Sequence, residues 1–188
     1  MPDQGNLIRV PALAAGVSMS KPCQLSSVVE GETYFVGSST HRRGPLFKLP
    51  QMANLLIDPL YGYRKQAKFL IHCFVVMPDH FHPLPTPVPG VTLERALQLI
   101  KGGFSCGIKK ELRMALDVWE LGFTDRRVRR GEYDGMRRYI EQNPVEARLV
   151  KCAADYPYGS ASGKFEVDPV PPRLVTSAAK AVASGGSS

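Results

Sequence analysis

Apolar positions recur with a helical period in two long segments of the chain. Between residues 49 and 65 they fall three to four positions apart, as at Met52, Leu55 and Leu60, which is typical of an amphipathic helix. Pro59 lies inside this pattern and cannot donate a helical hydrogen bond, so we expect a kink there or two short helices. A second pattern of this kind predicts a long helix that begins at Thr92.

Other apolar runs are typical of β-strands. Residues 32–39 predict a first strand. Residues 68–77 are apolar on both faces, which favours a position in the middle of a sheet. Pro78 and Asp79 then favour a tight turn into the next strand, and residues 118–128 predict a fourth.

Strands interleaved with two long helices predict an α+β sandwich, in which an antiparallel sheet of about four strands carries helices on one face. Residues 1–31 have no sustained period and predict a poorly ordered extension. Residues 159–188 are rich in Gly, Ser, Ala and Pro and predict a disordered tail. The expected domain therefore covers residues 32–158.

Composition narrows the class of partner. The 188 residues carry a net charge of +7, which favours a polyanion such as nucleic acid, although many soluble proteins are as basic. The four cysteines contain no C-x-x-C pair, which disfavours a zinc ribbon and predicts reduced thiols in the cytoplasm. No apolar run approaches the roughly twenty residues of a membrane span.

Two short motifs contain candidate metal ligands and a candidate nucleophile. His80 and His82 stand two positions apart in a strand, so they share a face and two imidazoles can converge on a divalent ion. Tyr139 and Asn143 stand one helical turn apart, in a helix from about residue 132 that we expect to end before Pro144. They offer a phenol nucleophile and an amide oxygen for a hard cation. The alternative is that the histidines and the tyrosine are structural, as we expect for His72.

Taken together, these motifs resemble the REP-associated tyrosine transposases, a branch of the single-tyrosine HUH transposases. The resemblance runs from about residue 33 to residue 160. The order and spacing of the matching segments are together more specific than any single motif. The matching segments are residues 33–36, 75–82, 99–105, 119–125 and 139–145.

This resemblance implies a ferredoxin-like fold and a site in which His80, His82 and Asn143 hold Mg²⁺ or Mn²⁺. It implies that Tyr139 attacks single-stranded DNA, at hairpins of repetitive extragenic palindromes, and leaves a 5′-phosphotyrosine and a free 3′-hydroxyl that permits rejoining. Two alternatives stay open: a catalytically silent DNA-binding protein descended from such an enzyme, and a hydrolytic metalloenzyme. The sequence also leaves open a monomer or a homodimer.

Basic side chains suggest where DNA would lie. The densest group is Arg126, Arg127, Arg129 and Arg130, which we expect to face DNA. Arg42 and Arg43 lie in a loop whose pattern is as typical of a solvated turn as of a contact with phosphate. Lys101 and Ser105 flank Gly102 and Gly103, where either the DNA backbone approaches closely or the helix breaks.

Pro83 and Pro85 depart from the family pattern, in which aliphatic residues usually follow the second histidine. The backbone groups of residues i and i+2 face the same neighbouring strand, so both prolines remove donors on one side only. We therefore expect the histidine strand to be paired on one flank and frayed beyond His82 on the other. Such fraying would loosen the metal ligands and reduce activity.

Overall fold

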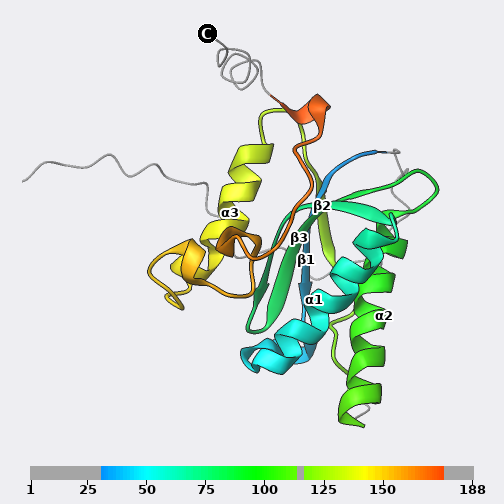
Figure 1. The fold of residues 1–188 in the computed structure, drawn as a ribbon, viewed down its shortest axis with the longest axis vertical. Helices are drawn as coiled ribbons and strands as arrows, with labels where there is room; N and C mark the ends of the chain where they lie inside the picture. The colour runs from blue at the N-terminus through cyan, green and yellow to red at the C-terminus, as the bar shows by residue number, and fades with distance from the viewer. Residues whose placement is uncertain (1–30, 114–116, 176–188) are drawn as a thin grey trace, which may run out of the picture.

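The computed structural model describes residues 31–113 and 117–175. Its centre is a four-stranded antiparallel sheet with the order β2-β3-β1-β4 (Figure 1). The strands are β1 (Tyr34–Ser39), β2 (Phe69–Met77), β3 (His80–Pro87) and β4 (Thr124–Arg127). The predicted fourth strand is shorter than expected, because Trp119 forms only an isolated bridge with Thr40 and the continuous ladder with β1 begins at Thr124.

Helix α1 (Pro50–Lys65) connects β1 to β2, and α2 (Leu93–Leu112) connects β3 to β4. This order of elements and strands is the ferredoxin-like arrangement, so the predicted α+β fold is confirmed. Helices α1 and α2 cover one face of the sheet, here called the α1–α2 face. A further helix, α3 (Tyr133–Glu146), packs on the opposite face, here called the α3 face (Figure 1). The expectation of helices on one face is therefore wrong for α3.

Pro59 and Gly103 explain how the two long helices pack. Helix α1 continues through Pro59 and α2 continues through Gly103, so the alternatives of two short helices and of a helix break, which the sequence left open, do not occur. A Cβ added at Gly103 would lie 2.6 Å from Cβ of Pro59. Gly103 thus lets the helices approach each other, whereas Gly102 has no neighbour within 4 Å of such an atom.

Strand β2 is an edge strand, so the central position expected from its apolar sequence is wrong. Its faces are covered by helices, and its outer edge is bonded by the first part of residues 156–174, here called the strap. The strap accepts a hydrogen bond from the Val76 N–H at Tyr158 O (2.8 Å), and Asp168 N–H donates to Ile71 O (2.7 Å). Edge groups of β2 are therefore satisfied without a further strand.

The strap is anchored by a largely buried ion pair. Both oxygens of the Asp168 carboxylate accept hydrogen bonds from Arg64 at 2.9 Å, and one also accepts from Ile71 N–H at 2.7 Å. Burial alone would raise the pKa of Asp168, but these bonds outweigh burial and hold it below its usual value. The predicted disorder is therefore wrong for residues 159–175, while residues 176–188 and 1–30 lie outside the described part of the chain.

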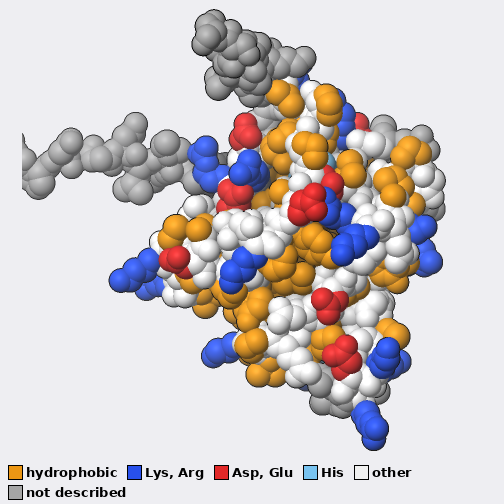
Figure 2. All heavy atoms as spheres, in the orientation of Figure 1, with side chains coloured by type: hydrophobic (Ala, Val, Ile, Leu, Met, Phe, Trp, Pro, Cys, Tyr) orange, Lys and Arg blue, Asp and Glu red, His pale blue; other side chains and the backbone are white. Residues whose placement is uncertain are grey.

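Figure 2 shows the side of the molecule along which the strap passes. Apolar side chains gather at the centre of this view, between α3 and α1, and charged side chains of both signs surround them. Within the described ranges, no helix has the length and apolar character needed to cross a membrane. Cys73, Cys106 and Cys152 are free thiols, as expected.

The proline strand pairs as the sequence predicts. The ladder between β3 and β2 extends to Pro87, with an irregularity between Ile71 and Phe74, whereas β3 and β1 are in register only at His80 and Phe81. The neighbour that Pro83 and Pro85 fail to bond is therefore β1. One-sided pairing of β3 beyond His82 is confirmed.

Candidate active site

The two histidines lie on the α3 face. Alternation along β3 sends the Phe81 ring into the α1–α2 core, where it packs against Trp119, and sends His80 and His82 to the other side. Their rings meet edge to face, with centroids 4.9 Å apart. The expectation that they share a face is met.

His82 is held by β1. Its Nδ1 lies 2.9 Å from Val36 O, and because a carbonyl oxygen only accepts, Nδ1 must carry the proton and Nε2 keeps its lone pair. Burial is the main cause that lowers the pKa of His82, to about 4, so the ring is neutral near pH 7. A Cβ at Gly37 would lie 3.1 Å from Cε1 of His82, so this glycine leaves room for the ring.

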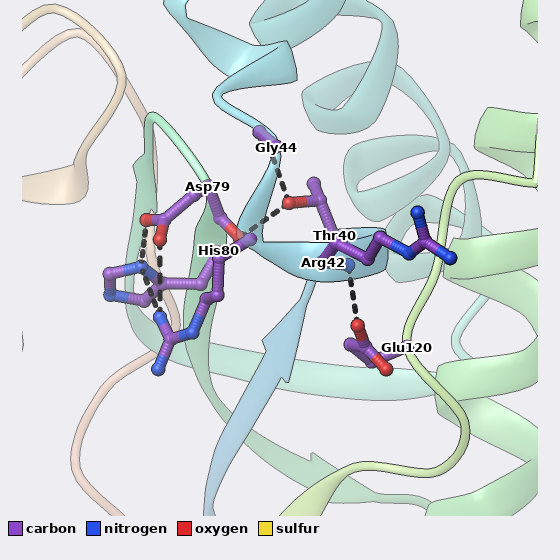
Figure 3. Close-up of polar contacts among 7 residues, drawn as sticks. Thr40, Arg42, Gly44, Asp79, His80 and Glu120 are labelled. Atoms are coloured by element: carbon purple, nitrogen blue, oxygen red, sulfur yellow. Dashed lines mark hydrogen bonds and ion pairs between the residues drawn. The ribbon is translucent and has the colours of Figure 1, made fainter.

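His80 is held by its neighbour in the turn. Its Nδ1 lies 2.6 Å from Oδ1 of Asp79 (Figure 3). Burial raises the pKa of Asp79, but the bond to His80 and the charge of Arg43 outweigh burial and bring it below its usual value. An ionised carboxylate only accepts, so Nδ1 of His80 donates, and in the neutral ring Nε2 then carries the lone pair.

Tyr139 reaches this pair from α3. Its ring centroid lies 5.8 Å from that of His82 and 5.6 Å from that of Phe35. We expected helix α3 to end before Pro144. It instead continues through Pro144 to Glu146. The last turn persists because Ala147 N–H bonds to Asn143 O and Leu149 N–H bonds to Pro144 O. Asn143, half-buried, therefore still stands one turn beyond Tyr139 on the same helix.

The donor set fits a divalent cation that uses two imidazoles and an oxygen. Each Nδ1 is held by an oxygen acceptor, so in the neutral rings both Nε2 atoms carry lone pairs, an arrangement that is usual for histidines that bind metals. Over the ranges that the structure describes, no group of three His, Cys, Asp or Glu side chains could hold a metal. A third protein ligand would have to be of another type, and an amide oxygen such as that of Asn143 is a donor of this kind.

Arg43, but not Arg42, is directed at the histidines. Its guanidinium lies 3.3 Å from Oδ2 of Asp79 and 3.3 Å from Nδ1 of His80. The side chain of Arg42 extends away from His80 (Figure 3), while its backbone N–H donates to Glu120. The structure thus separates two arginines that the sequence placed in one group.

The arginines of β4 divide between the two faces. Arg126 pairs across the sheet with Phe35, and Arg127 pairs with Tyr34. Directly opposed residues share a face, so Arg126 belongs to the α3 face beside the Phe35 ring, where it pairs with Glu132 at 2.6 Å. Arg127 belongs to the α1–α2 face.

A basic pocket lies beyond the end of β4. Arg127, Arg129 and Arg130 line a surface pocket of about 370 Å³ together with Arg173 of the strap. Arg173 also pairs with Glu32 and donates to Thr33 Oγ1 at 3.1 Å. Sequence reasoning missed Arg173 because it treated this segment as a disordered tail, and no local motif marks it.

Lys101 and Ser105 are not gathered with the histidines, because α2 covers the opposite face. Both line a surface cavity of about 480 Å³. Nζ of Lys101 donates to Gly122 O at 3.0 Å and lies 5.0 Å from the centroid of the Trp119 ring. Burial lowers the pKa of Lys101.

His72 is structural, as expected. It is 3 % exposed and far along β2 from the turn. Its Nε2 lies 2.8 Å from Thr86 Oγ1, and its Nδ1 lies 3.2 Å from Asp168 O. Both ring nitrogens therefore have partners that belong to the sheet and the strap.

Comparison with solved structures places this geometry among known folds. No protein-family model matches the chain, and no curated protein is significantly similar to it. A REP-associated tyrosine transposase bound to a REP hairpin superimposes with a TM-score of 0.63 at 22 % identity, over 85 % of this chain and 96 % of that one. The chain has the fold of that transposase. The predicted resemblance is thereby confirmed at the level of the fold.

A second solved structure, a candidate transposase from Deinococcus radiodurans, is a more distant match. Its TM-score is 0.46 at 18 % identity, over 66 % of this chain and 97 % of that one.

Proposed function

We propose that this protein is a metal-dependent transesterase, a transposase or nickase that cleaves and rejoins single-stranded DNA at hairpins. The observation that carries the proposal is the contact of the Tyr139 ring with His82, whose Nε2 is left available beside that of His80. A nucleophile beside a pair of metal-ligand side chains is the arrangement that such a reaction needs. The hairpin-bound transposase of the same fold supports the choice of substrate.

Each residue has a distinct task in this reaction. The phenolic oxygen of Tyr139 forms a bond to phosphorus and loses its proton, while the bond to the 3′ oxygen breaks and that oxygen takes up a proton. The reverse reaction rejoins the strand without ATP, because the phosphotyrosine conserves the energy of the bond. His80, His82 and Asn143 would hold Mg²⁺ or Mn²⁺, which supplies polarisation of the scissile phosphate when bound.

The arginines would hold the DNA. Arg126 lies on the same face as Tyr139, and Arg43 reaches the histidine pair. Arg129 and Arg130 continue the basic surface beyond the end of β4. Guanidinium groups bind phosphates in a fixed, two-pronged geometry, so this surface suits a strand that enters the site.

The decisive test is a covalent adduct. Wild-type protein incubated with Mn²⁺ and single-stranded DNA that contains a hairpin should yield an adduct that survives denaturation. Tyr139→Phe should abolish the adduct and retain DNA binding. Tyr133→Phe is the matched control, since it removes the hydroxyl of a buried tyrosine in the same helix, and it should leave the adduct intact.

Two results would contradict the proposal. An adduct undiminished in Tyr139→Phe would show that another residue is the nucleophile. Wild-type protein that binds the hairpin but yields no adduct with Mn²⁺ or Mg²⁺ would instead indicate the silent DNA-binding protein.

A further inference from the structure

The turn between β2 and β3 is clamped by the segment that follows β1. Thr40 N–H donates to Asp79 O at 2.9 Å, and Phe47 N–H donates to Pro78 O at 2.9 Å. The hydroxyl of Thr40 lies 2.8 Å from the same Asp79 oxygen and 2.7 Å from Gly44 O (Figure 3). Both carbonyls of the turn are therefore occupied, and the backbone of Asp79 is fixed independently of its side chain.

The Asp79 side chain can therefore bond elsewhere, and it bonds to two neighbouring side chains. Oδ1 lies 2.6 Å from Nδ1 of His80, and Oδ2 lies 3.3 Å from the guanidinium of Arg43. Arg43 also lies 3.3 Å from the same Nδ1, but two donors cannot bond to each other. The shorter bond to the carboxylate decides the proton position, so Nδ1 of His80 donates and Arg43 bonds only to Asp79.

The loop carries backbone strain where it presents Arg43. Arg42 and Arg43 have φ angles of 51° and 54°, in the left-handed region that residues with a side chain seldom adopt. Strain of this kind persists only where surrounding contacts determine it. Those contacts are the Arg43 N–H bond to Thr40 O and the ion pair with Asp79.

We propose that Asp79 is a positioning residue that holds His80 with its Nδ1 protonated and its Nε2 lone pair available for a metal. His82 obtains the same orientation from a backbone carbonyl, Val36 O. The orientation of His80 instead depends on the Asp79 side chain. A substitution of Asp79 can therefore disturb His80 and leave the bond that holds His82 in place. Arg43 shares the carboxylate and fixes its second oxygen. This inference rests on the proposed metal-dependent function.

Two measurements test the inference without reference to DNA cleavage. The first is the tautomer of His80 in metal-free protein near pH 7, from nitrogen-15 NMR. The second is the affinity for Mn²⁺, from calorimetry. Asp79→Ala should shift His80 towards the Nε2–H tautomer and weaken Mn²⁺ binding about 10- to 100-fold, as removal of such an oriented partner usually does.

The conservative variant separates orientation from charge. Asp79→Asn retains an oxygen that can accept from Nδ1, so it should keep the wild-type tautomer and most of the affinity. Glu120→Gln is the control, because it removes one negative charge from the other side of the same loop and should change neither quantity. If Asp79→Ala fails to fold, Asp79→Ser keeps a small polar residue in the turn and makes the same test.

The inference is overturned if Asp79→Ala keeps both the wild-type tautomer and the wild-type Mn²⁺ affinity. It is also overturned if Asp79→Asn is as impaired as Asp79→Ala, since the charge would then matter and the acceptor would not. Wild-type protein that binds no Mn²⁺ would remove the metal from the proposed function, while the tautomer comparison would still decide the role of Asp79.

Discussion

The two faces of the sheet are built from the same strands and differ in what covers them. On the α1–α2 face, aromatic rings such as Phe47, Phe81 and Phe104 are fully buried in one continuous core. On the α3 face, His82 packs against Phe35 and Tyr139, and both of these rings are only partly buried. The α1–α2 face is therefore covered by a packed apolar core. On the α3 face, polar side chains lie beside partly buried aromatic rings.

We expect this difference to separate effects on stability from effects on the proposed chemistry. Adjacent residues of β3 serve opposite purposes, since Phe81 enters the core and His80 and His82 enter the site. A substitution on one face can therefore be compared with a matched substitution on the other.

The largest expected effect is on DNA binding. Replacement of Arg126, Arg127, Arg129 and Arg130 by Gln should weaken binding to single-stranded DNA and flatten its salt dependence by roughly 0.7 in log–log slope for each phosphate that the protein no longer binds. The matched variant replaces Lys101, Lys109, Lys110 and Arg113, which belong to α2 and its end. It should leave the slope nearly unchanged. Equal slopes for both variants, measured by titration at several salt concentrations, would refute the placement of DNA at the arginine cluster rather than along α2.

The next effect concerns Gly37 on the α3 face. An alanine Cβ there would lie 2.7 Å from Thr124 Oγ1 and 3.1 Å from the His82 ring, so we expect both side chains to shift and the bond from His82 to Val36 O to be strained. Gly37→Ala should weaken Mn²⁺ binding about 10-fold or more, as measured by calorimetry. Unchanged Mn²⁺ affinity would mean that His82 is not a ligand or that the ring stays in place.

A matched pair of glycines tests the α1–α2 face. Gly103→Ala places Cβ 2.6 Å from the rigid Pro59 ring and should lower the free energy of unfolding by about 1–3 kcal/mol. Gly102→Ala meets no atom within 4 Å and should raise it by up to about 1 kcal/mol. Chemical denaturation measures both. Neither variant should change Mn²⁺ affinity, and a change in it would mean that the faces are coupled.

The smallest effect is a pH dependence that arises from His72. Burial lowers the pKa of His72 in the folded protein, so the unfolded chain binds more protons as the pH falls below about 6.5. The free energy of unfolding should therefore be greatest above that pH and fall on acidification. His72→Gln cannot titrate and should show a shallower dependence in metal-free denaturation from pH 7.5 to 5.5. An identical slope would assign the dependence to other groups, of which His82 is one.

Much of the site follows from short-range geometry. The two-residue period of a strand places His80 and His82 on one face, and the pitch of a helix places Asn143 one turn beyond Tyr139. The Pro78-Asp79 turn and the one-sided pairing beyond His82 follow from proline chemistry in the same way. These relations hold within a few residues, so they could be predicted without knowledge of the fold.

Long-range relations were predicted less well. The apolar run of residues 69–77 suggested a central strand, but β2 is an edge strand that the strap covers. Gly103 suggested a helix break or an approach of DNA, but its neighbour is Pro59 of another helix. The apolar pattern of β2 indicated its burial correctly but not the segment that covers it, and the glycine pair gave no sign of the helix that Gly103 contacts.

The sequence by itself determined the order of elements, the faces of the strand residues and the residue types of the site. Only the tertiary structure decided that α3 packs on the face opposite α1 and α2, which brings Tyr139 to His82 and leaves Lys101 and Ser105 on the other side of the sheet. The reason is physical. Periodicity is set by the local backbone, whereas the side of a sheet on which a helix packs depends on contacts between segments far apart in the chain.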